Sequence, residues 1–205
     1  METNSEHRLL FPTDLGPMAQ VLAQSFEEDP LVSFILPNRK TRVKTVARFF
    51  RAMGRLNIRN HMAFGISDPL EGVAVWNFPD KPETSASPKD LLAFFPVLLS
   101  SYPFGARKAR AVFHHIETNH KKYASEPHFY LDNLGVLASA RGRGLSSKLI
   151  RPFLAMADEQ KVVAYTDTVT ESNVSLYEHF GFECVERSPV KGTGITVYAL
   201  RRPAR

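Results

Sequence analysis

The stretch Arg141-Gly142-Arg143-Gly144-Leu145-Ser146-Ser147 decides the fold, because it joins a predicted strand to a predicted helix. Residues 129–136, FYLDNLGV, are aromatic and aliphatic enough to predict the strand. Glycine lets the turn approach an anion closely, and the first N–H groups of the helix have no partner within it. Arg141 and Arg143 add two permanent positive charges. The stretch therefore predicts a phosphate-binding turn, with a plain corner carrying solvated arginines as the alternative. The apolar face of the predicted helix repeats at helical spacing through Leu145, Leu149, Ile150, Phe153, Leu154 and Ala157.

A second motif, residues 173–182 with the sequence NVSLYEHFGF, follows one further predicted strand. The order strand, glycine turn, helix, strand and second motif resembles the GNAT N-acetyltransferase superfamily. Its acetyl-CoA signature, Arg/Gln-x-x-Gly-x-Gly/Ala, is matched by Arg141, Gly144 and Ser146, although Ser replaces the usual Gly or Ala. Its second signature, an Asn followed by Leu/Phe-Tyr-Glu and Gly-Phe, is matched within the second motif.

Three shorter stretches resemble the puromycin N-acetyltransferase branch of that superfamily. They are residues 72–76 (GVAVW), Glu126-Pro127 and residues 149–152 (LIRP). Residues 137–140 (LASA) depart from the pattern, because an acidic residue and a proline are frequent before the turn. The resemblance to this branch suggests an enzyme of the antibiotic-resistance type.

The resemblance implies the GNAT fold, an α/β (α+β) architecture. Its central sheet is mixed and mostly antiparallel, with a splayed pair of parallel strands and helices on both faces. The 205 residues are enough for one core, so we expect a single N-acetyltransferase domain over residues 1–205. Strands are expected at 7–11, 61–66, 72–78, 129–136, 162–167, 182–186 and 195–200. Helices are expected at 13–26, 40–57, 88–99, 106–123, 145–157 and 173–181, with a connector at 31–36, a linker at 79–88 and a frayed basic tail at 201–205.

By this resemblance the protein is an acetyl-CoA-dependent enzyme that moves an acetyl group to a primary amine of a small molecule by direct attack in a ternary complex. Tyr177 would be the general acid that protonates the thiolate, since an unperturbed phenol has a pKa of about 10. Asn173, four residues earlier, lies on the same helical face and would cap the helix. The residues expected to contact acetyl-CoA are Leu134, Val136, Arg141, Gly142, Arg143, Gly144, Leu145, Ser146, Ser147 and Asn173.

Two carboxylates are candidates for the general base. Asp167 stands after a strand at the place where the puromycin branch usually has Glu. Asp132 faces away from Leu131 on the central strand. Either side chain could instead be an ordinary carboxylate at the end of a strand.

The composition of the chain limits which binding partners and which cellular compartment we expect. Residues 30–60 hold 8 of the 26 Lys and Arg and no Asp or Glu, and we expect most of these cations on the solvated face of one helix. A polyanionic cofactor or an acidic partner could use the same charge. No motif indicates nucleic acid, and no signal peptide or long apolar segment indicates a membrane. A single cysteine, Cys184, fits a reducing compartment, so we expect a cytoplasmic monomer or homodimer.

Two other functions remain open. A protein lysine or N-terminal acetyltransferase would need an open peptide groove. A non-catalytic CoA-binding module would not need Tyr177. We expect no metal cofactor, because the spacing of His114, His115, Glu117 and His120 gathers only some of them on one helical face.

Overall fold

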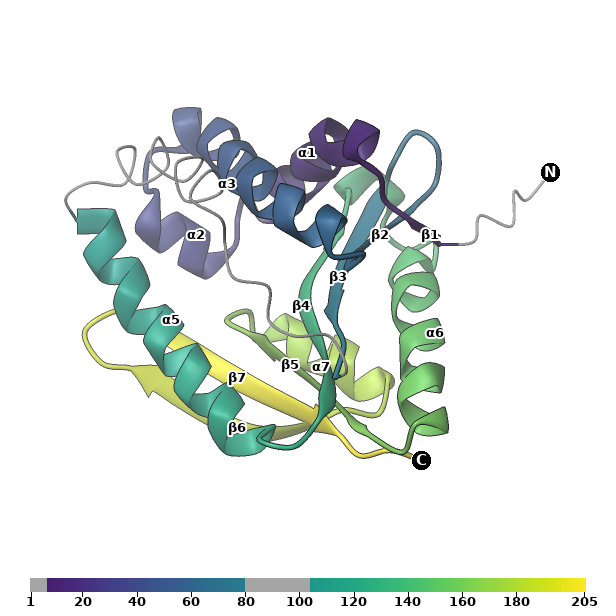
Figure 1. Ribbon diagram of the computed structural model, residues 1–205. Helices are drawn as coiled ribbons and strands as arrows, with labels where there is room; N and C mark the ends of the chain where they lie inside the picture. Colours follow the sequence, from purple (N-terminus) through teal and green to yellow (C-terminus); the bar gives the residue numbers. More distant parts are fainter. Residues whose placement is uncertain (1–6, 80–103) are drawn as a thin grey trace.

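The computed structural model describes residues 7–79 and 104–205, which form one seven-stranded sheet surrounded by helices (Figure 1). The strand order is β1-β2-β3-β4-β5-β7-β6. Neighbours are antiparallel except β4 and β5, which are parallel. The expected fold class is thus confirmed. The strands are β1 Arg8–Leu9, β2 Ala63–Ile66, β3 Gly72–Asn77, β4 His128–Val136, β5 Val163–Thr168, β6 Glu183–Val190 and β7 Ile195–Arg202.

Helices cover both faces of the sheet, and their bounds lie close to those predicted. The predicted helix at 88–99, and the linker at 79–88 beyond Pro79, lie outside the described residues. None of the described helices is both long and apolar enough to cross a membrane. The helices are α1 Leu15–Ser25, α2 Pro30–Ile35, α3 Arg39–Arg59, α5 Phe104–Tyr123, α6 Leu145–Glu159 and α7 Ser172–His179, with short 3₁₀ turns at Pro12–Asp14 and Ala138–Ala140.

Two large apolar cores hold α6 and the α1–α3 pair on the sheet. On one face, Trp76 of β3 stacks on Phe153 of α6, and its indole N–H donates to the carbonyl of Leu149 at 3.1 Å. On the other face, α1 and α3 pack on Val73 and Val75 of the same strand. The alternation along β3 therefore anchors α6 and the α1–α3 pair on opposite sides of the sheet.

The prediction of an apolar connector at residues 31–36 is wrong, because this segment forms helix α2. Asp29 caps it: one carboxylate oxygen accepts from the backbone N–H groups of Leu31 at 2.9 Å and Val32 at 3.1 Å. Pro30 occupies the first helical position, where its missing N–H costs nothing. The Asp-Pro pair is thus a helix start in this chain rather than only a break.

The prediction of a frayed tail at residues 201–205 is also wrong for its first two residues. Arg201 and Arg202 belong to β7, and Arg202 is buried. The Arg202 guanidinium donates to both carboxylate oxygens of Asp158 in α6, each at 2.8 Å. The backbone N–H of Arg205 donates to the same carboxylate at 2.8 Å. Asp158 therefore holds the end of the chain against α6.

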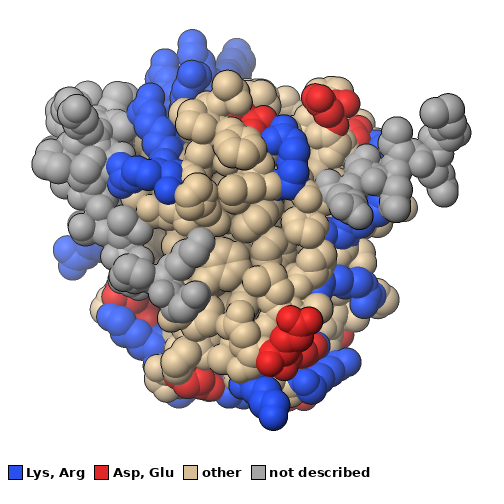
Figure 2. Space-filling model, turned by 45° about the vertical axis from the view of Figure 1, so that its right-hand side comes forward, with Lys and Arg blue, Asp and Glu red and all other residues tan. Residues whose placement is uncertain are grey.

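Seven of the eight cations of residues 30–60 are exposed on α3, as expected. Figure 2 shows Lys and Arg side chains gathered near the top of the molecule, where α3 lies in Figure 1. Arg42 is the exception. It is only 4% exposed.

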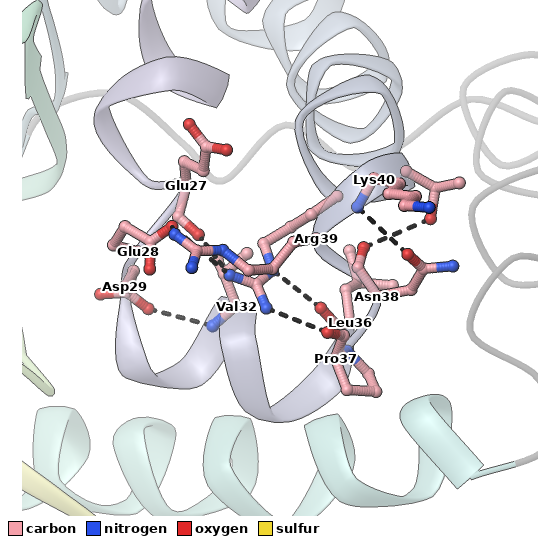
Figure 3. Close-up of polar contacts among 11 residues, drawn as sticks. Glu27, Glu28, Asp29, Val32, Leu36, Pro37, Asn38, Arg39 and Lys40 are labelled. Atoms are coloured by element: carbon pink, nitrogen blue, oxygen red, sulfur yellow. Dashed lines mark hydrogen bonds and ion pairs between the residues drawn. The ribbon is translucent and has the colours of Figure 1, made fainter.

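Buried Arg42 joins the ends of three helices. Figure 3 labels the residues whose carbonyl groups it contacts, Glu27, Leu36 and Pro37. Its guanidinium donates to the carbonyl oxygens of Leu36 at 2.8 Å, Glu27 at 3.0 Å and Pro37 at 3.3 Å. These carbonyls follow α1 and α2, where helices leave acceptors unpaired. One side chain of α3 thus satisfies the chain ends on both sides of α2.

We expect Arg42→Met to lower the free energy of unfolding by about 2–4 kcal/mol, because three carbonyls lose a charged donor while most of the apolar stem remains. Urea unfolding monitored by circular dichroism measures this loss. Arg48→Met, the same change at an exposed position of α3, should stay within about 0.5 kcal/mol of the unaltered protein. A loss below about 1 kcal/mol for Arg42→Met would show that water satisfies these carbonyls.

Candidate active site

The parallel strands β4 and β5 separate after one defined pair of residues. Their register runs from His128↔Val163 to Leu131↔Thr166 and continues no further. Beyond it β4 remains paired with β3, and β5 with β7. The Thr166 hydroxyl donates to the carbonyl of Leu131 at 2.9 Å and closes the last rung. We call the opening beyond this pair the fork.

Both predicted base candidates stand at the fork. Asp132 is the first residue of β4 beyond the last pair, and Asp167 is the first of β5. Asp132 is also the bulged residue of β4, because Val75 pairs with Asn133 and Trp76 with Leu131. A bulge redirects one side chain from the regular alternation. The structure therefore brings together two carboxylates that are distant in the sequence.

Tyr130 completes this group, and the sequence analysis missed it. Its hydroxyl donates to Asp167 Oδ2 at 3.0 Å, and the Asn133 side-chain amide donates to Asp132 Oδ2 at 2.9 Å. Tyr130 precedes Asp132 by two residues, a spacing that places side chains on one face of a strand. That spacing was the available signal, but an aromatic residue in a central strand is more often a core residue.

The surroundings disfavour charge on both carboxylates. Desolvation raises the pKa of Asp132 to about 6, against hydrogen bonds from Asn133 and Tyr130. Desolvation raises the pKa of Asp167 to about 7, with a further contribution from the charge of Asp132 and opposition from the Tyr130 hydrogen bond. Both side chains remain partly exposed. They are therefore groups that exchange a proton near neutral pH and that solvent can reach.

Tyr177 lies on the other face of the sheet, in the core that α6 covers. Burial raises the pKa of its phenol to about 12; a hydrogen bond with Thr166 opposes this shift and the charge of Asp167 adds to it. The phenol thus stays protonated at neutral pH. It is a weaker acid than the unperturbed phenol assumed from the sequence, and it remains a hydrogen-bond donor.

Asn173 does not cap α7, so that prediction is wrong. The helix begins at Ser172 with Glu171 at the N-cap position, and Asn173 lies inside its first turn. The Asn173 amide instead donates to the Thr168 hydroxyl at 3.3 Å. Asn173 therefore joins α7 to the end of β5, close to the fork.

The glycine turn predicted from the sequence has the backbone expected of it. Gly142 and Gly144 have φ values of 77° and 75°, in the left-handed region that favours glycine. A Cβ on either residue would meet no atom within 4 Å, so the space beside the turn is open among the described residues. Gly144 is the N-cap of α6 and provides no side-chain cap. The first N–H groups of α6 therefore receive no side-chain cap from this residue.

Three side chains near this turn differ in how they are held. Arg143 donates to Glu71 at 2.8 Å, which lowers the pKa of that carboxyl. The Ser147 hydroxyl accepts from Arg151 at 2.7 Å. Arg141 is exposed, and no ion pair joins it to another residue of the described ranges. Of the two arginines expected at the turn, Arg141 is therefore the one available to an anion.

Two histidines of α5, His115 and His120, make structural contacts. His115 hydrogen-bonds Ser188 at 2.8 Å, and His120 hydrogen-bonds His128 at 2.7 Å. The His120 ring stacks on Tyr165, and burial together with His128 lowers its pKa to about 4. Within the described ranges, no group of three or more His, Cys, Asp or Glu side chains could hold a metal ion.

A surface pocket of about 290 Å³ lies between α6, α7 and the end of the chain. Arg151, His179 and Arg205 are among its lining residues. It contains none of the predicted site residues, so the fork and the glycine turn are the better candidates for the active site.

Comparison with known proteins agrees with the fold and the turn. Residues 101–201 match the sequence model of the family described as the acetyltransferase (GNAT) domain. That range includes β4, the fork, the glycine turn and Tyr177. Nearly half of the chain, including the glycine turn, therefore resembles a GNAT acetyltransferase domain.

Solved structures of acetyltransferases cover nearly the whole chain. The histone acetyltransferase HPA2 and related acetyltransferase from Corynebacterium glutamicum superposes with a TM-score of 0.63 at 19% identity, over 98% of this chain and 97% of that one. Arylalkylamine N-acetyltransferase 2 from Aedes aegypti superposes with a TM-score of 0.63 at 12% identity, over 99% of this chain and 100% of that one. Polyamine N-acetyltransferase from Drosophila melanogaster superposes with a TM-score of 0.64 at 13% identity, over 98% of this chain and 100% of that one. At these identities the likeness shows the fold, and with the matched domain it supports an N-acetyltransferase enzyme.

A curated protein of Dictyostelium discoideum, named "probable serine/threonine-protein kinase", is 24% identical over 193 aligned residues. The alignment covers 85% of this chain and 20% of that protein. This chain thus spans about a fifth of the length of the curated relative it matches. The kinase name describes the longer protein.

The raised pKa of Asp167 predicts a pH-dependent stability difference. Its carboxyl has a pKa of about 7 in the folded protein and about 4 when unfolded, so folding binds a proton between these values and stability falls as the pH rises through them. Asn carries no charge. We therefore expect the free energy of unfolding of Asp167→Asn, relative to that of the unaltered protein, to increase by about 2–3 kcal/mol from pH 5 to pH 8.

Urea unfolding at pH 5 and pH 8 measures this gain. Asp158→Asn is the control, because Arg202 lowers the pKa of Asp158 and the carboxyl is ionised in both states throughout this range. Its stability difference from the unaltered protein should be unfavourable and independent of pH. If the stability difference between Asp167→Asn and the unaltered protein were also independent of pH, the raised pKa would be contradicted.

Proposed function

We propose that this protein is an acetyl-CoA-dependent N-acetyltransferase that acetylates a primary amine of a small molecule by direct attack in a ternary complex. The observation that carries the proposal is the fork. Two carboxylates with raised pKa values lie at it on one face of the sheet, and the Tyr177 phenol lies near it from the other. An acid and a base on opposite sides of a gap suit a transfer between two bound molecules.

In this proposal the cofactor runs from the glycine turn to the fork. The pyrophosphate binds the N–H groups at the start of α6, where the left-handed glycines leave open space. Residues 142–147 and the exposed cation of Arg141 form this site, and Arg143 holds the turn through Glu71. Leu134 and Val136 lie beyond the fork on β4, so their backbone groups on the β5 side are available to the pantetheine arm. Asn173 lies close to its acetyl end.

The chemical step needs a neutral amine, a polarised carbonyl and a stabilised thiolate. Asp167 or Asp132 accepts the proton of the ammonium, because their raised pKa values make them stronger bases than ordinary carboxylates. A main-chain N–H near Val136 polarises the carbonyl. Tyr177 donates to the departing thiolate; with a pKa near 12 it acts first as a hydrogen-bond donor and then as the proton source.

A small amine is favoured over a protein substrate by the position of the carboxylates. They lie at the base of the fork, beside the last paired residues of β4 and β5, where an acceptor must enter between two strands. The named structural neighbours include arylalkylamine and polyamine N-acetyltransferases. As the more specific branch and compartment, we propose the puromycin N-acetyltransferase branch and the cytoplasm.

The direct test is a panel of amines assayed by thiol release from acetyl-CoA. Arylalkylamines, polyamines, puromycin and a lysine peptide make up the panel. We expect turnover with at least one small amine and little with the peptide. Turnover with the peptide alone would favour the protein acetyltransferase, and acetyl-CoA binding without any turnover would favour the CoA-binding module.

With an accepted amine, we expect Tyr177→Phe to lower kcat by about a hundredfold or more while acetyl-CoA affinity is kept. The ring and its packing remain, and only the hydroxyl is lost. A packing role would cost about 1 kcal/mol, or near fivefold. The measurement needs conditions in which chemistry limits turnover. A loss below about tenfold would remove Tyr177 from the chemical step.

Gly144→Ala should weaken acetyl-CoA binding at least tenfold, because a methyl group would stand where the phosphate approaches the turn. Gly192→Ala is a matched control: its φ is 76°, and a Cβ there also meets nothing within 4 Å. Both variants carry the same backbone strain, but Gly192 lies in the turn between β6 and β7. Calorimetry measures both affinities. Equal affinities for the two variants would place the phosphate elsewhere.

A further inference from the structure

The exposed side of α3 carries a straight row of cations, which we call the basic row. Its members recur every three or four residues, an interval that places side chains above one another on one face of a helix. At a rise of 1.5 Å per residue, the basic row is about 22 Å long. It consists of the exposed side chains of Lys40, Lys44, Arg48, Arg51 and Arg55.

The cations of the basic row are not used to hold the described fold together. Within residues 7–79 and 104–205, no ion pair or hydrogen bond joins any of these side chains to another residue. Two other cations of α3, on different faces of the helix, do have partners. The Arg39 side chain pairs with Glu28 at 2.5 Å, and buried Arg42 donates to three carbonyl groups. The basic row is therefore available to a ligand.

Charges of one sign in such a row repel one another and destabilise the helix that carries them. On the exposed side of α5 this repulsion is avoided, because Glu117 pairs with Lys121 one turn later at 2.5 Å. The basic row has no such relief, since residues 30–60 contain no Asp or Glu. A face that only had to stay in water could mix the two signs as α5 does. A row of one sign is better explained as a surface for a ligand with several negative charges.

The basic row offers charge and no exposed apolar anchor. The large apolar side chains that are exposed among the described residues are Phe11, Phe113 and Met156, and none of them belongs to α3. Helices that bind membranes bury apolar side chains in the lipid, and single-stranded nucleic acids stack their bases on aromatic rings. A membrane surface and a single-stranded nucleic acid are therefore poor matches to this surface.

The spacing of the cations favours an acidic helix over other polyanions. Carboxylates that recur every three or four residues of a helix rise by about 5.4 Å per turn, as the basic row does. The phosphates of one strand of duplex DNA recur every 3.4 Å or so along the axis, at about two thirds of that interval. An acidic helix lying along α3 can thus place one carboxylate beside each cation in turn.

A second copy of this chain does not supply such a helix from its described part. None of the six described α-helices contains more than two Asp or Glu residues, so none presents a row of carboxylates over four turns. The matching ligand is therefore expected on a different protein.

We propose that the basic row of α3 is a docking surface for an acidic helix of another protein, in which Asp or Glu recurs every three or four residues over about four turns. The inference goes beyond acetyl transfer and does not depend on it, because no residue of the fork or of the glycine turn lies on α3. Docking there leaves both of those places uncovered by α3 itself.

The test measures binding of two synthetic helical peptides to the full chain by fluorescence anisotropy in dilute salt. In the first peptide, Glu residues form one row along an otherwise Ala and Gln helix of about five turns. The second has the same composition, with its Glu residues spread evenly around the helix, and both are stapled so that their helicity is equal. We expect the first peptide to bind at least about tenfold more tightly, because only it faces several cations at once.

A pair of double variants tests the position of the site. Arg48→Glu with Arg51→Glu reverses two charges in the middle of the basic row and should weaken binding of the first peptide by about tenfold or more. Lys161→Glu with Lys191→Glu is the matched control, because it changes the net charge equally at exposed positions outside α3. We expect the control to bind the first peptide within about twofold of the unaltered protein, since its basic row is intact. Acetyl-CoA affinity should be the same in both double variants.

Three results would overturn the proposal. Equal affinities for the two peptides would show that the spacing of the carboxylates is irrelevant. Equal losses in the two double variants would show that the net charge of the protein, and not the basic row, attracts the peptide. Tighter binding of a duplex oligonucleotide or of anionic lipid vesicles than of the first peptide would assign the surface to that polyanion instead. If the charge reversal folds poorly by circular dichroism, Arg48→Gln with Arg51→Gln provides the same comparison against Lys161→Gln with Lys191→Gln.

Discussion

The end of pairing between β4 and β5 is the constraint on which the site depends. Parallel strands hold each other through regular backbone hydrogen bonds, and here those bonds stop at Leu131 and Thr166. Each strand keeps its other neighbour, so the sheet stays intact while a gap opens within it. Backbone groups that would be satisfied in a closed sheet thereby become available to a ligand. The two carboxylates occupy the first positions where such groups appear.

The other elements hold this opening in shape. Thr166 closes the last rung through its side chain, and the bulge at Asp132 turns one carboxylate out of the regular alternation. Gly135 lets α1 approach β4, since a Cβ there would lie 3.0 Å from Leu22 and Ser25. Rigid supports on both faces are what a site needs if its acid and base are to keep their separation.

The fold and much of the candidate site could be predicted from the sequence, because local motifs carry them. The glycine turn, the helix after it and the tyrosine of the second motif are each encoded within a few neighbouring residues. The place of Tyr130 in the site could not be predicted, because it depends on a strand break and a bulge that arise from the pairing of β4 with β5 and β3. The buried states of Arg42 and Arg202 were missed for the same reason: their partners lie on other elements, and a cation without a visible partner is expected at the surface. The N-cap of α7 was predicted at Asn173, two residues after its actual place at Glu171, an error typical of helix ends.

The uneven distribution of charge has a consequence for the molecule as a whole. Because α3 and its flanks hold 8 of the 26 basic residues and none of the 21 acidic ones, the remainder of the chain carries more acidic than basic residues despite the overall charge of +5. The protein is therefore an electric dipole whose positive end lies at α3. In a field, or near any charged body, such a molecule rotates before it collides. The rate at which it meets a polyanion thus depends on orientation as well as diffusion, and dissolved salt weakens that guidance over about 10 Å.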